Sequence, residues 1–240
     1  MFAGPARDLA ARMDAAHAAA ALDVGAGSGV VASAMAACPV VVAVDPSLEM
    51  LRVARENGIV RVVAGGLPDL PFANASFDRV TAGFVLSHVA DYHGALREMG
   101  RILRSGGKLG VTCWSKLDNE YREYWDGLVD KVVDRDSLRA ATARWVPWED
   151  WLADRGRLRE TVHEAGLHEV TVEEIEYPVH TTIADFLTIR EASGTARFLR
   201  TVLDPEDWER FCATARAEFQ SHFRDPVEYT RRALIAIGTR

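Results

Sequence analysis

The stretch Leu22-Asp-Val-Gly-Ala-Gly-Ser-Gly29 decides the fold. It begins inside a short apolar run at 20–24, as a buried strand would, and its three glycines stand at alternate positions where a helix is expected to start. Glycine accepts the tight, left-handed backbone of such a turn and lets the chain approach a ligand closely. The amides at the start of the following helix can bind a negative or polar group. The stretch therefore predicts a strand, a ligand-binding turn and a helix in succession.

Outward from this stretch, strand-like apolar runs alternate with helix-like periodic segments as far as Trp114. Strands are expected at about 20–24, 40–44, 59–63, 78–82 and 108–114, and helices near 29–37, 47–57 and 92–103. This alternation is typical of repeated βαβ units and predicts a parallel sheet. The tripeptide Ser105-Gly106-Gly107 is expected to end the helix at 92–103, because glycine tolerates the backbone of a helix exit.

The pattern changes after Trp114 to helical segments that carry Trp125, Trp145, Trp148 and Trp151. A helix is expected at 158–165, an alternating strand at 168–177, a helical block at 183–223 and a last strand at 232–238. We expect a core at 1–115, a helical insertion at 116–156, a core helix and strand at 157–181, a second helical insertion at 182–228 and a final core strand at 229–240. The insertions predict a lid over the strand ends, where ligands of open α/β sheets bind, although they could instead only cover the sheet edge.

The composition excludes several classes of protein. The 240 residues are 48% apolar and 26% charged, and the formal net charge of -7 provides no positive field for nucleic acid or for an anionic membrane surface. The cysteines Cys38, Cys113 and Cys212 form no C-x-x-C pair, so we expect no disulfide framework, no metal site and a reducing, cytoplasmic setting. Charged residues interrupt 1–21, which argues against a secretory signal, and no apolar run approaches the roughly 18 residues of a membrane span.

Two acids accompany the glycine turn. Asp45 ends the second strand about 20 residues beyond Gly25, which suits a carboxylate that holds the hydroxyls of a ribose. Asp23 precedes Gly25 within the first strand, where its carboxylate could reach a cationic amino group or could bond backbone amides of the turn. A nicotinamide dehydrogenase would place the third glycine of its G-x-G-x-x-G loop at position 30, which is Val30 here. The turn and Asp45 together predict a nucleotide-like cofactor that is a poor match for a nicotinamide dinucleotide.

Four segments in this order carry a resemblance to a known family. They are Leu22-Asp-Val-Gly-Ala-Gly-Ser-Gly29, Val44-Asp-Pro-Ser-Leu-Glu-Met-Leu51, Leu70-Pro-Phe-Ala-Asn-Ala-Ser-Phe-Asp-Arg-Val80 and Ala95-Leu-Arg-Glu-Met-Gly-Arg-Ile-Leu-Arg-Ser-Gly-Gly107. Over about residues 19–114 the chain resembles the class I S-adenosylmethionine-dependent methyltransferases, in particular the ubiquinone/menaquinone-biosynthesis-like and small-molecule members. The resemblance implies a Rossmann-like, mostly parallel sheet of seven strands with the last strand antiparallel. It also implies S-adenosylmethionine lying across the strand ends, with S-adenosylhomocysteine as product.

The resemblance further implies roles for single residues. Asp23 and Gly25-Ala26-Gly27 would face the methionine part of the cofactor, Asp45 the ribose, and Pro46 and Met50 the adenine, while Gly83 and Phe84 would lie on the methionine side. Met50 could instead be a plain core residue. In the family the third strand commonly ends in Gly-Asp, whose acid holds the adenine amino group, but this chain has Ala64-Gly-Gly-Leu67. Adenine must then be read by backbone groups around Gly66 and Leu67, by another side chain, or more weakly.

The segment before the first strand is another departure. Family members often have a longer leader with aromatic residues that close over the cofactor, whereas here about 20 residues precede the first strand. Either the insertion at 116–156 supplies the cover, or the true start lies upstream of Met1.

Methyl transfer needs mainly alignment and exclusion of water, so a dedicated base is optional. His88, about one helical turn past Phe84, is the candidate for a base or a substrate-orienting group, with a structural bond at a helix end as the alternative. Tyr92 and His93 are expected to be exposed or to cap the next helix. An apolar pocket could be built from Trp145, Trp148, Trp151, His180 and Phe186, although tryptophans at this spacing could simply be core.

We therefore expect an enzyme that moves a methyl group from S-adenosylmethionine to an oxygen or nitrogen of a small molecule. The residues after the fourth strand, Thr81-Ala-Gly-Phe84, lack the Asn-Pro-Pro-Tyr-like tetrapeptide of amide and base N-methyltransferases, which disfavours DNA and protein-amide acceptors. The alternatives are a binding or regulatory protein of the same fold without catalysis, another S-adenosylmethionine-fold enzyme, and a dehydrogenase. The sequence leaves the acceptor and the oligomeric state open.

Overall fold

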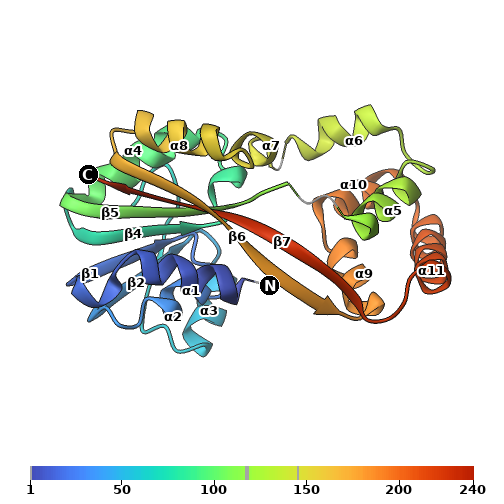
Figure 1. The fold of residues 1–240 in the computed structure, drawn as a ribbon, viewed down its shortest axis with the longest axis horizontal. Coiled ribbons are helices and arrows are strands. Elements are labelled where there is room, and N and C mark those ends of the chain that lie inside the picture. Colours follow the sequence, from blue (N-terminus) through green and yellow to red (C-terminus); the bar gives the residue numbers. More distant parts are fainter. Residues whose placement is uncertain (1, 117–118, 145) are drawn as a thin grey trace. The chain divides into compact units, whose positions relative to one another are not determined.

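The computed structural model describes residues 2–116, 119–144 and 146–240, and within this part of the chain seven strands form one sheet (Figure 1). The strands are β1 (Ala20–Val24), β2 (Val40–Asp45), β3 (Arg61–Ala64), β4 (Phe77–Gly83), β5 (Leu103–Trp114), β6 (His168–Thr181) and β7 (Val227–Thr239). The helices are α1 (Ala3–Arg12), η1 (Ala15–His17), α2 (Val30–Ala34), α3 (Leu48–Glu56), η2 (Leu86–His88), α4 (Tyr92–Ile102), α5 (Glu120–Val129), α6 (Arg135–Thr142), α7 (Glu149–Leu152), α8 (Arg155–Glu164), α9 (Ile183–Glu191), α10 (Gly194–Val202) and α11 (Pro205–His222).

The sheet has the order β3-β2-β1-β4-β5-β7-β6. β1 pairs in parallel with β2 on one side and with β4 on the other, β3 continues in parallel beyond β2, and β5 continues in parallel beyond β4. β7 runs antiparallel to β5, which confirms the predicted Rossmann-like sheet with an antiparallel last strand. From β1 the chain adds β2 and β3 toward one edge of the sheet, and it then returns to place β4 on the other side of β1. The strand order therefore reverses between β1 and β4, and the carboxyl ends of these two strands form the switch point at which open α/β sheets bind ligands.

Helices cover both faces of the sheet. Figure 1 shows α4 and α8 on one side and α1, α2 and α3 on the other. Leu22 of β1 belongs to the hydrophobic cluster that contains Met99 of α4, whereas its neighbour Ala21 belongs to the cluster that contains Leu9 of α1. Successive strand side chains point to opposite faces, so β1 is buried on both.

The strand expected at 20–24 matches β1 residue for residue. The interpretation of Ser105-Gly106-Gly107 as the end of a helix is wrong, because α4 already ends at Ile102 and the tripeptide lies inside β5. Gly106 has a φ of 75°, its amide donates to the Arg240 carbonyl at 2.9 Å, and the Arg240 amide donates to the Gly107 carbonyl at 2.9 Å. These glycines pair the start of β5 with the end of the chain rather than capping α4.

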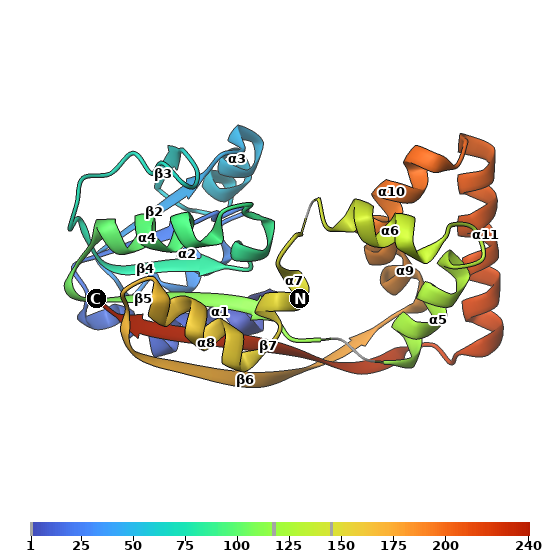
Figure 2. The ribbon, with the colours of Figure 1, turned by 90° about the horizontal axis from the view of Figure 1, so that it is seen from above.

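The chain divides into two compact units. The first contains residues up to 116, 148–175 and 232–240, and the second contains the described residues of 117–147 together with 176–231. The second unit holds α5, α6, α9, α10 and α11, which Figure 2 draws from above, around a core with Trp125, Phe186 and Phe219. Residues 148–156, expected in the first insertion, contribute Leu152 to the core of the first unit. The lid role of the helical segments stays a prediction.

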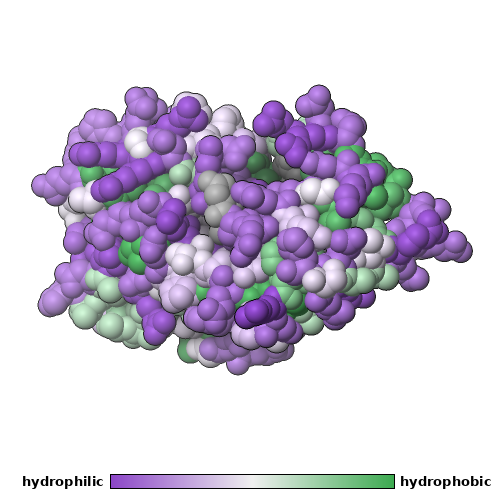
Figure 3. Space-filling view, turned by 45° about the vertical axis from the view of Figure 1, so that its right-hand side comes forward, coloured by the Kyte–Doolittle hydropathy of each residue, from purple (hydrophilic) through white to green (hydrophobic). Residues whose placement is uncertain are grey.

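Hydrophilic residues cover most of the face drawn in Figure 3, in keeping with a chain of which 26% is charged. Among the described residues, no helix combines the length and the apolarity that crossing a membrane requires.

Candidate functional site at the carboxyl ends of the strands

Three glycines shape the turn after β1. Gly25, Gly27 and Gly29 have φ values of 63°, 54° and 83°, in the left-handed region that other residues disfavour. Between them the Ala26 amide donates to the Val44 carbonyl at 3.1 Å, which holds the turn against the end of β2. The strand–turn–helix unit expected from Leu22–Gly29 is present, and α2 starts directly after Gly29.

Asp45, the last residue of β2, is held by the same turn. One carboxylate oxygen accepts the Gly27 amide at 2.8 Å, and the other accepts the Ser47 amide at 2.8 Å. The residue is 7% exposed. Because each carboxylate oxygen can accept two hydrogen bonds, each still offers one position to a further donor. Two neighbouring hydroxyls, such as those of a ribose, would use both positions.

The three glycines differ in what surrounds them. A Cβ added to Gly25 would lie 2.6 Å from Val85 Cγ2, and one added to Gly29 would lie 2.7 Å from Ile59 Cγ1. A Cβ added to Gly27 would meet no heavy atom within 4 Å. Packing inside the protein therefore explains the first and third glycines, whereas Gly27 borders space that protein atoms leave open beside Asp45.

Asp23 is sealed inside the fold. It is 1% exposed, one carboxylate oxygen accepts the Ala32 amide at 2.9 Å, and the other accepts the Thr81 hydroxyl at 3.1 Å. Burial raises the pKa of Asp23 to about 7, although both hydrogen bonds act to lower it, and the nearby Asp45 charge adds to the rise. Two roles were considered for Asp23, a contact with a cationic amino group and a hydrogen bond to a backbone amide. The structure contains the second, from the Ala32 amide.

The residues expected beside adenine lie where β2 and β3 end. Gly66 sits against Pro46, since a Cβ added to Gly66 would lie 3.4 Å from Pro46 Cβ. Met50 is 39% exposed in the first turn of α3, so it is not a core residue, and Leu67 is half-buried against the sheet. The Asp69 amide donates to the Gly66 carbonyl at 3.1 Å, which makes Asp69 part of a local turn.

An aromatic cluster lies where β4 and β5 end. Phe84 has a φ of 60°, and its amide donates to both the carbonyl and the hydroxyl of Thr112, at 3.0 and 3.1 Å. Its ring stacks on Trp114 with centroids 4.2 Å apart and an interplanar angle of 24°, and the Phe2 ring stands edge-on to Phe84 at 5.2 Å. A left-handed backbone at a residue with a side chain is strained and is typical of functional positions.

Phe2 and Trp114 belong to this aromatic cluster but are not among the site residues predicted from the sequence. Trp114 ends the strand predicted at 108–114, so its position at the carboxyl edge of the sheet was a usable signal, whereas nothing in the sequence marks Phe2. Gly83, expected on the methionine side, is packed against α2, because a Cβ there would lie 2.9 Å from Val31 Cγ2.

His88 is the last residue of η2 and is exposed, and its catalytic role stays a prediction. The expectation that Tyr92 is exposed or capping is wrong. Tyr92 is 5% exposed, and its ring meets Trp148 edge-on at 4.7 Å. Asp91 caps α4 instead by accepting the Gly94 amide at 2.8 Å, which leaves the apolar Tyr92 ring free to pack inward.

The apolar pocket considered for the insertions is not gathered in one unit. Trp148 and Trp151 belong to the first unit, His180 and Phe186 belong to the second, and Trp145 lies outside the described residues. Phe186 is 1% exposed and serves as core, and Trp151 is 39% exposed beneath the Arg157 guanidinium at 4.3 Å.

The cysteines are buried and free. Burial raises the pKa of Cys113 to about 12 and that of Cys212 to about 11, so both thiols stay protonated at neutral pH and are poor nucleophiles. No group of three or more His, Cys, Asp or Glu side chains suited to a metal ion occurs among the residues that the structure describes.

Comparison with known proteins matches residues 22–111 to the family model of a methyltransferase domain. The demethylmenaquinone methyltransferase of Corynebacterium urealyticum is 39% identical over 122 residues, which are 47% of this chain and 51% of that protein. The chain thus spans about half the length of the curated relatives it matches. The match covers the glycine turn, Asp45 and Phe84, but not the second unit.

Solved structures share the fold over nearly the whole chain. The YcgJ protein of Bacillus subtilis superposes with a TM-score of 0.60 at 18% identity and covers 99% of this chain and 98% of its own. Phosphoethanolamine N-methyltransferase 2 of Haemonchus contortus, in complex with phosphomonomethylethanolamine and S-adenosylhomocysteine, superposes with a TM-score of 0.50 at 20% identity, over 92% of this chain and 48% of its own. At these identities the likeness establishes the architecture alone.

Proposed function

We propose that the protein moves a methyl group from S-adenosylmethionine to an oxygen or nitrogen of a small molecule, because residues 22–111 match the family model of a methyltransferase domain. The observation that carries the proposal is the bond from the Gly27 amide to the Asp45 carboxylate. It joins the open turn after β1, at the switch point of the sheet, to an acid at the end of β2 whose oxygens can each accept a further hydrogen bond.

The residues at this edge fit the nucleoside end of the cofactor. Asp45 offers one acceptor position on each oxygen to the ribose hydroxyls, and the space at Gly27 lets a ligand approach the backbone. Met50 and Pro46 present apolar surface at the end of β2 for the adenine ring, with the backbone at Gly66 and Leu67 beside it. S-adenosylmethionine itself supplies a methyl group activated by its sulfonium.

The aromatic cluster supports the other half of the reaction. The rings of Phe2, Phe84 and Trp114 lie at the carboxyl ends of β4 and β5, where they would exclude water from the reacting atoms. His88 is placed two positions beyond Leu86 in η2 and would act as base or orienting group for a hydroxyl acceptor. The small-molecule character of the acceptor, the cytoplasmic location and the absence of a nucleic-acid partner remain part of the proposal. They rest on the net charge of -7 and on the three cysteines, which are free among the described residues.

Calorimetry tests the cofactor assignment. S-adenosylhomocysteine is expected to bind and NAD is not, and Asp45→Ala is expected to weaken S-adenosylhomocysteine binding about tenfold or more, since hydrogen bonds to a charged group are lost. Glu160→Gln, on α8, is the matched control and should leave the affinity unchanged. Equal affinity of Asp45→Ala and the parent protein would refute the assignment. A protein that binds the cofactor yet methylates no member of a panel of hydroxyl and amine acceptors would favour the regulatory alternative.

A further inference from the structure

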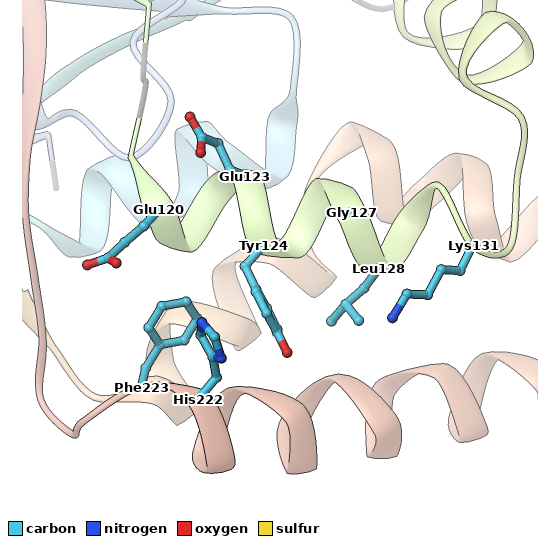
Figure 4. A pocket seen from close by; sticks show the side chains of 8 residues that line it. All are labelled: Glu120, Glu123, Tyr124, Gly127, Leu128, Lys131, His222 and Phe223. Atoms are coloured by element: carbon cyan, nitrogen blue, oxygen red, sulfur yellow. The ribbon is translucent and has the colours of Figure 1, made fainter.

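A groove in the second unit lies between α5 and the end of α11. It has a volume of about 440 Å³ and is lined by Glu120, Glu123, Tyr124, Gly127, Leu128, Lys131, His222 and Phe223 (Figure 4). All of these residues belong to the second unit, and none takes part in the site at the strand ends. The volume falls within the range of small-molecule sites.

Aromatic rings form one end of the groove. The Tyr124 and His222 rings stack with centroids 4.5 Å apart and an interplanar angle of 19°. Phe223 stands nearly perpendicular to both, at 5.2 Å from Tyr124 and 4.7 Å from His222. The ring faces of tyrosine and phenylalanine carry negative charge density and attract cations, so Tyr124 and Phe223 at one place favour a positively charged ligand.

Carboxylates reinforce this preference. Glu218 of α11 accepts the Tyr124 hydroxyl at 2.6 Å, and this hydrogen bond raises the pKa of Tyr124, so the phenol stays neutral and its ring is fixed beside a negative charge. Figure 4 shows Glu120 on the side of α5 that faces Phe223, whereas Glu123 points away from the rings. The aromatic end of the groove therefore combines ring faces with the carboxylate of Glu120, while Glu218 outside the lining holds the Tyr124 hydroxyl.

The other end of the groove has a different character. A Cβ added to Gly127 would meet no heavy atom within 4 Å, so the helix surface is open there, and Leu128 adds apolar wall beside it. Lys131 lines this end, beyond Leu128 along the chain and on the far side of it from His222 and Phe223 in Figure 4. An apolar body fits the middle of the groove, and the Lys131 ammonium disfavours a second positive charge at the far end.

We propose that this groove binds a small organic cation of the ammonium class, with its charged group against Tyr124 and Phe223 beside Glu120, and its uncharged body along Gly127 and Leu128. The inference does not depend on the proposed methyl transfer, because it uses only residues of the second unit.

Choline and its uncharged isostere, in which carbon replaces the quaternary nitrogen, test the proposal. The dissociation constant of each is measured with the full-length protein by NMR titration. Choline is expected to bind at least about fivefold more tightly than the isostere, because only the cation gains from the rings and carboxylates. Equal affinities would overturn the proposal, and so would binding of neither compound at millimolar concentration.

Variants locate the binding. Glu120→Gln and Tyr124→Leu are each expected to weaken choline binding about fivefold, while Glu123→Gln, three positions along the same helix, should change it little. Lys131→Gln should leave the affinity for choline equal or slightly higher.

Tyr124 is half-buried, so the Tyr124→Leu result counts only if the thermal unfolding curve of the variant is unchanged. Glu120 is exposed, so Glu120→Gln provides the test without that concern. Equal losses in Glu120→Gln and Glu123→Gln would show general screening rather than a site. S-adenosylhomocysteine calorimetry on the same variants keeps the outcome separate from the proposed function.

Discussion

At Asp23, burial and hydrogen bonding act in opposite directions on one carboxyl group. Its folded-state pKa of about 7 is above the reference value of 3.8, so between roughly pH 4 and pH 7 the folded protein holds a proton that the unfolded chain has lost. The stability that Asp23 contributes is therefore complete below pH 4 and is lost as the pH rises towards 7. In Asp23→Asn the amide oxygen still accepts the Ala32 amide, and this variant should lose less stability than the parent between pH 5 and pH 8, by an amount on the order of 2 kcal/mol. Urea unfolding at the two pH values measures the difference, and parallel losses in both proteins would mean that the Asp23 proton is not their source.

Gly66 occupies the position at which the methyltransferases that this chain resembles commonly have an acidic residue, and the structure has room for a side chain there. Its φ is not in the left-handed region, and an added Cβ would reach only to 3.4 Å from Pro46. Gly66→Asp is expected to tighten S-adenosylhomocysteine binding about three- to tenfold, because a carboxylate would accept the adenine amino group. Binding is measured by calorimetry. The control ligand is the inosine analogue of S-adenosylhomocysteine, which lacks that amino group, and the control variant is Gly66→Ala. A gain that persists with the analogue would mean that the acid acts through something other than the amino group.

At the level of elements, the strands that bear the site follow from the sequence, and some of their boundaries do not. The run at 20–24 is apolar except for Asp23 and is followed directly by Gly25, so its limits were predictable. Ser105-Gly106-Gly107 has the local chemistry of a helix exit, yet it lies in β5 because its partner is Arg240, more than a hundred residues away. The stacking of Trp114 on Phe84 also joins residues that are distant in the sequence, and neither segment contains a pattern that predicts this contact.

The glycine turn provides a further test, because Gly29 and Gly27 both have left-handed backbones but differ in their surroundings. Gly29→Ala should destabilise the protein by about 1–3 kcal/mol, since its Cβ would lie 2.7 Å from Ile59 in addition to the backbone strain. Gly27→Ala incurs the strain alone and should cost about 1 kcal/mol, but its methyl group enters the open space and should weaken S-adenosylhomocysteine binding at least tenfold. Thermal unfolding and calorimetry on both variants separate the effects. A Gly27→Ala protein that binds as tightly as the parent would place the ligand elsewhere.

At the scale of the whole molecule, the two units differ in how much their sequences predict. Residues 22–111 carry four family-like segments and match a family model, so the fold could be anticipated there, together with the glycine turn and its neighbour Asp45. The second unit offers only helical periodicity and aromatic residues, which predict a buried core but not which rings meet. Tyr124 and His222 are almost a hundred positions apart, and their stacking depends on the packing of α5 against α11.

Separate cores also predict separate responses to ligands. The core around Leu22 and Met99 and the core around Trp125 and Phe219 share no residue, and the residues proposed for each ligand belong to a single unit. A ligand stabilises the state to which it binds, so amide exchange should slow in the segments that contact the ligand and open together with its site. S-adenosylhomocysteine is expected to slow hydrogen exchange in 22–51 and 81–88, and choline in 120–131 and 218–223. Peptide-resolved exchange with each ligand, alone and together, measures this. At a fixed ligand concentration, Asp45→Ala and Glu120→Gln should each weaken only one of the two responses. If choline slowed exchange in 22–51 instead, the ammonium group would belong to the site at the strand ends, and the groove between α5 and α11 would have no ligand of this class.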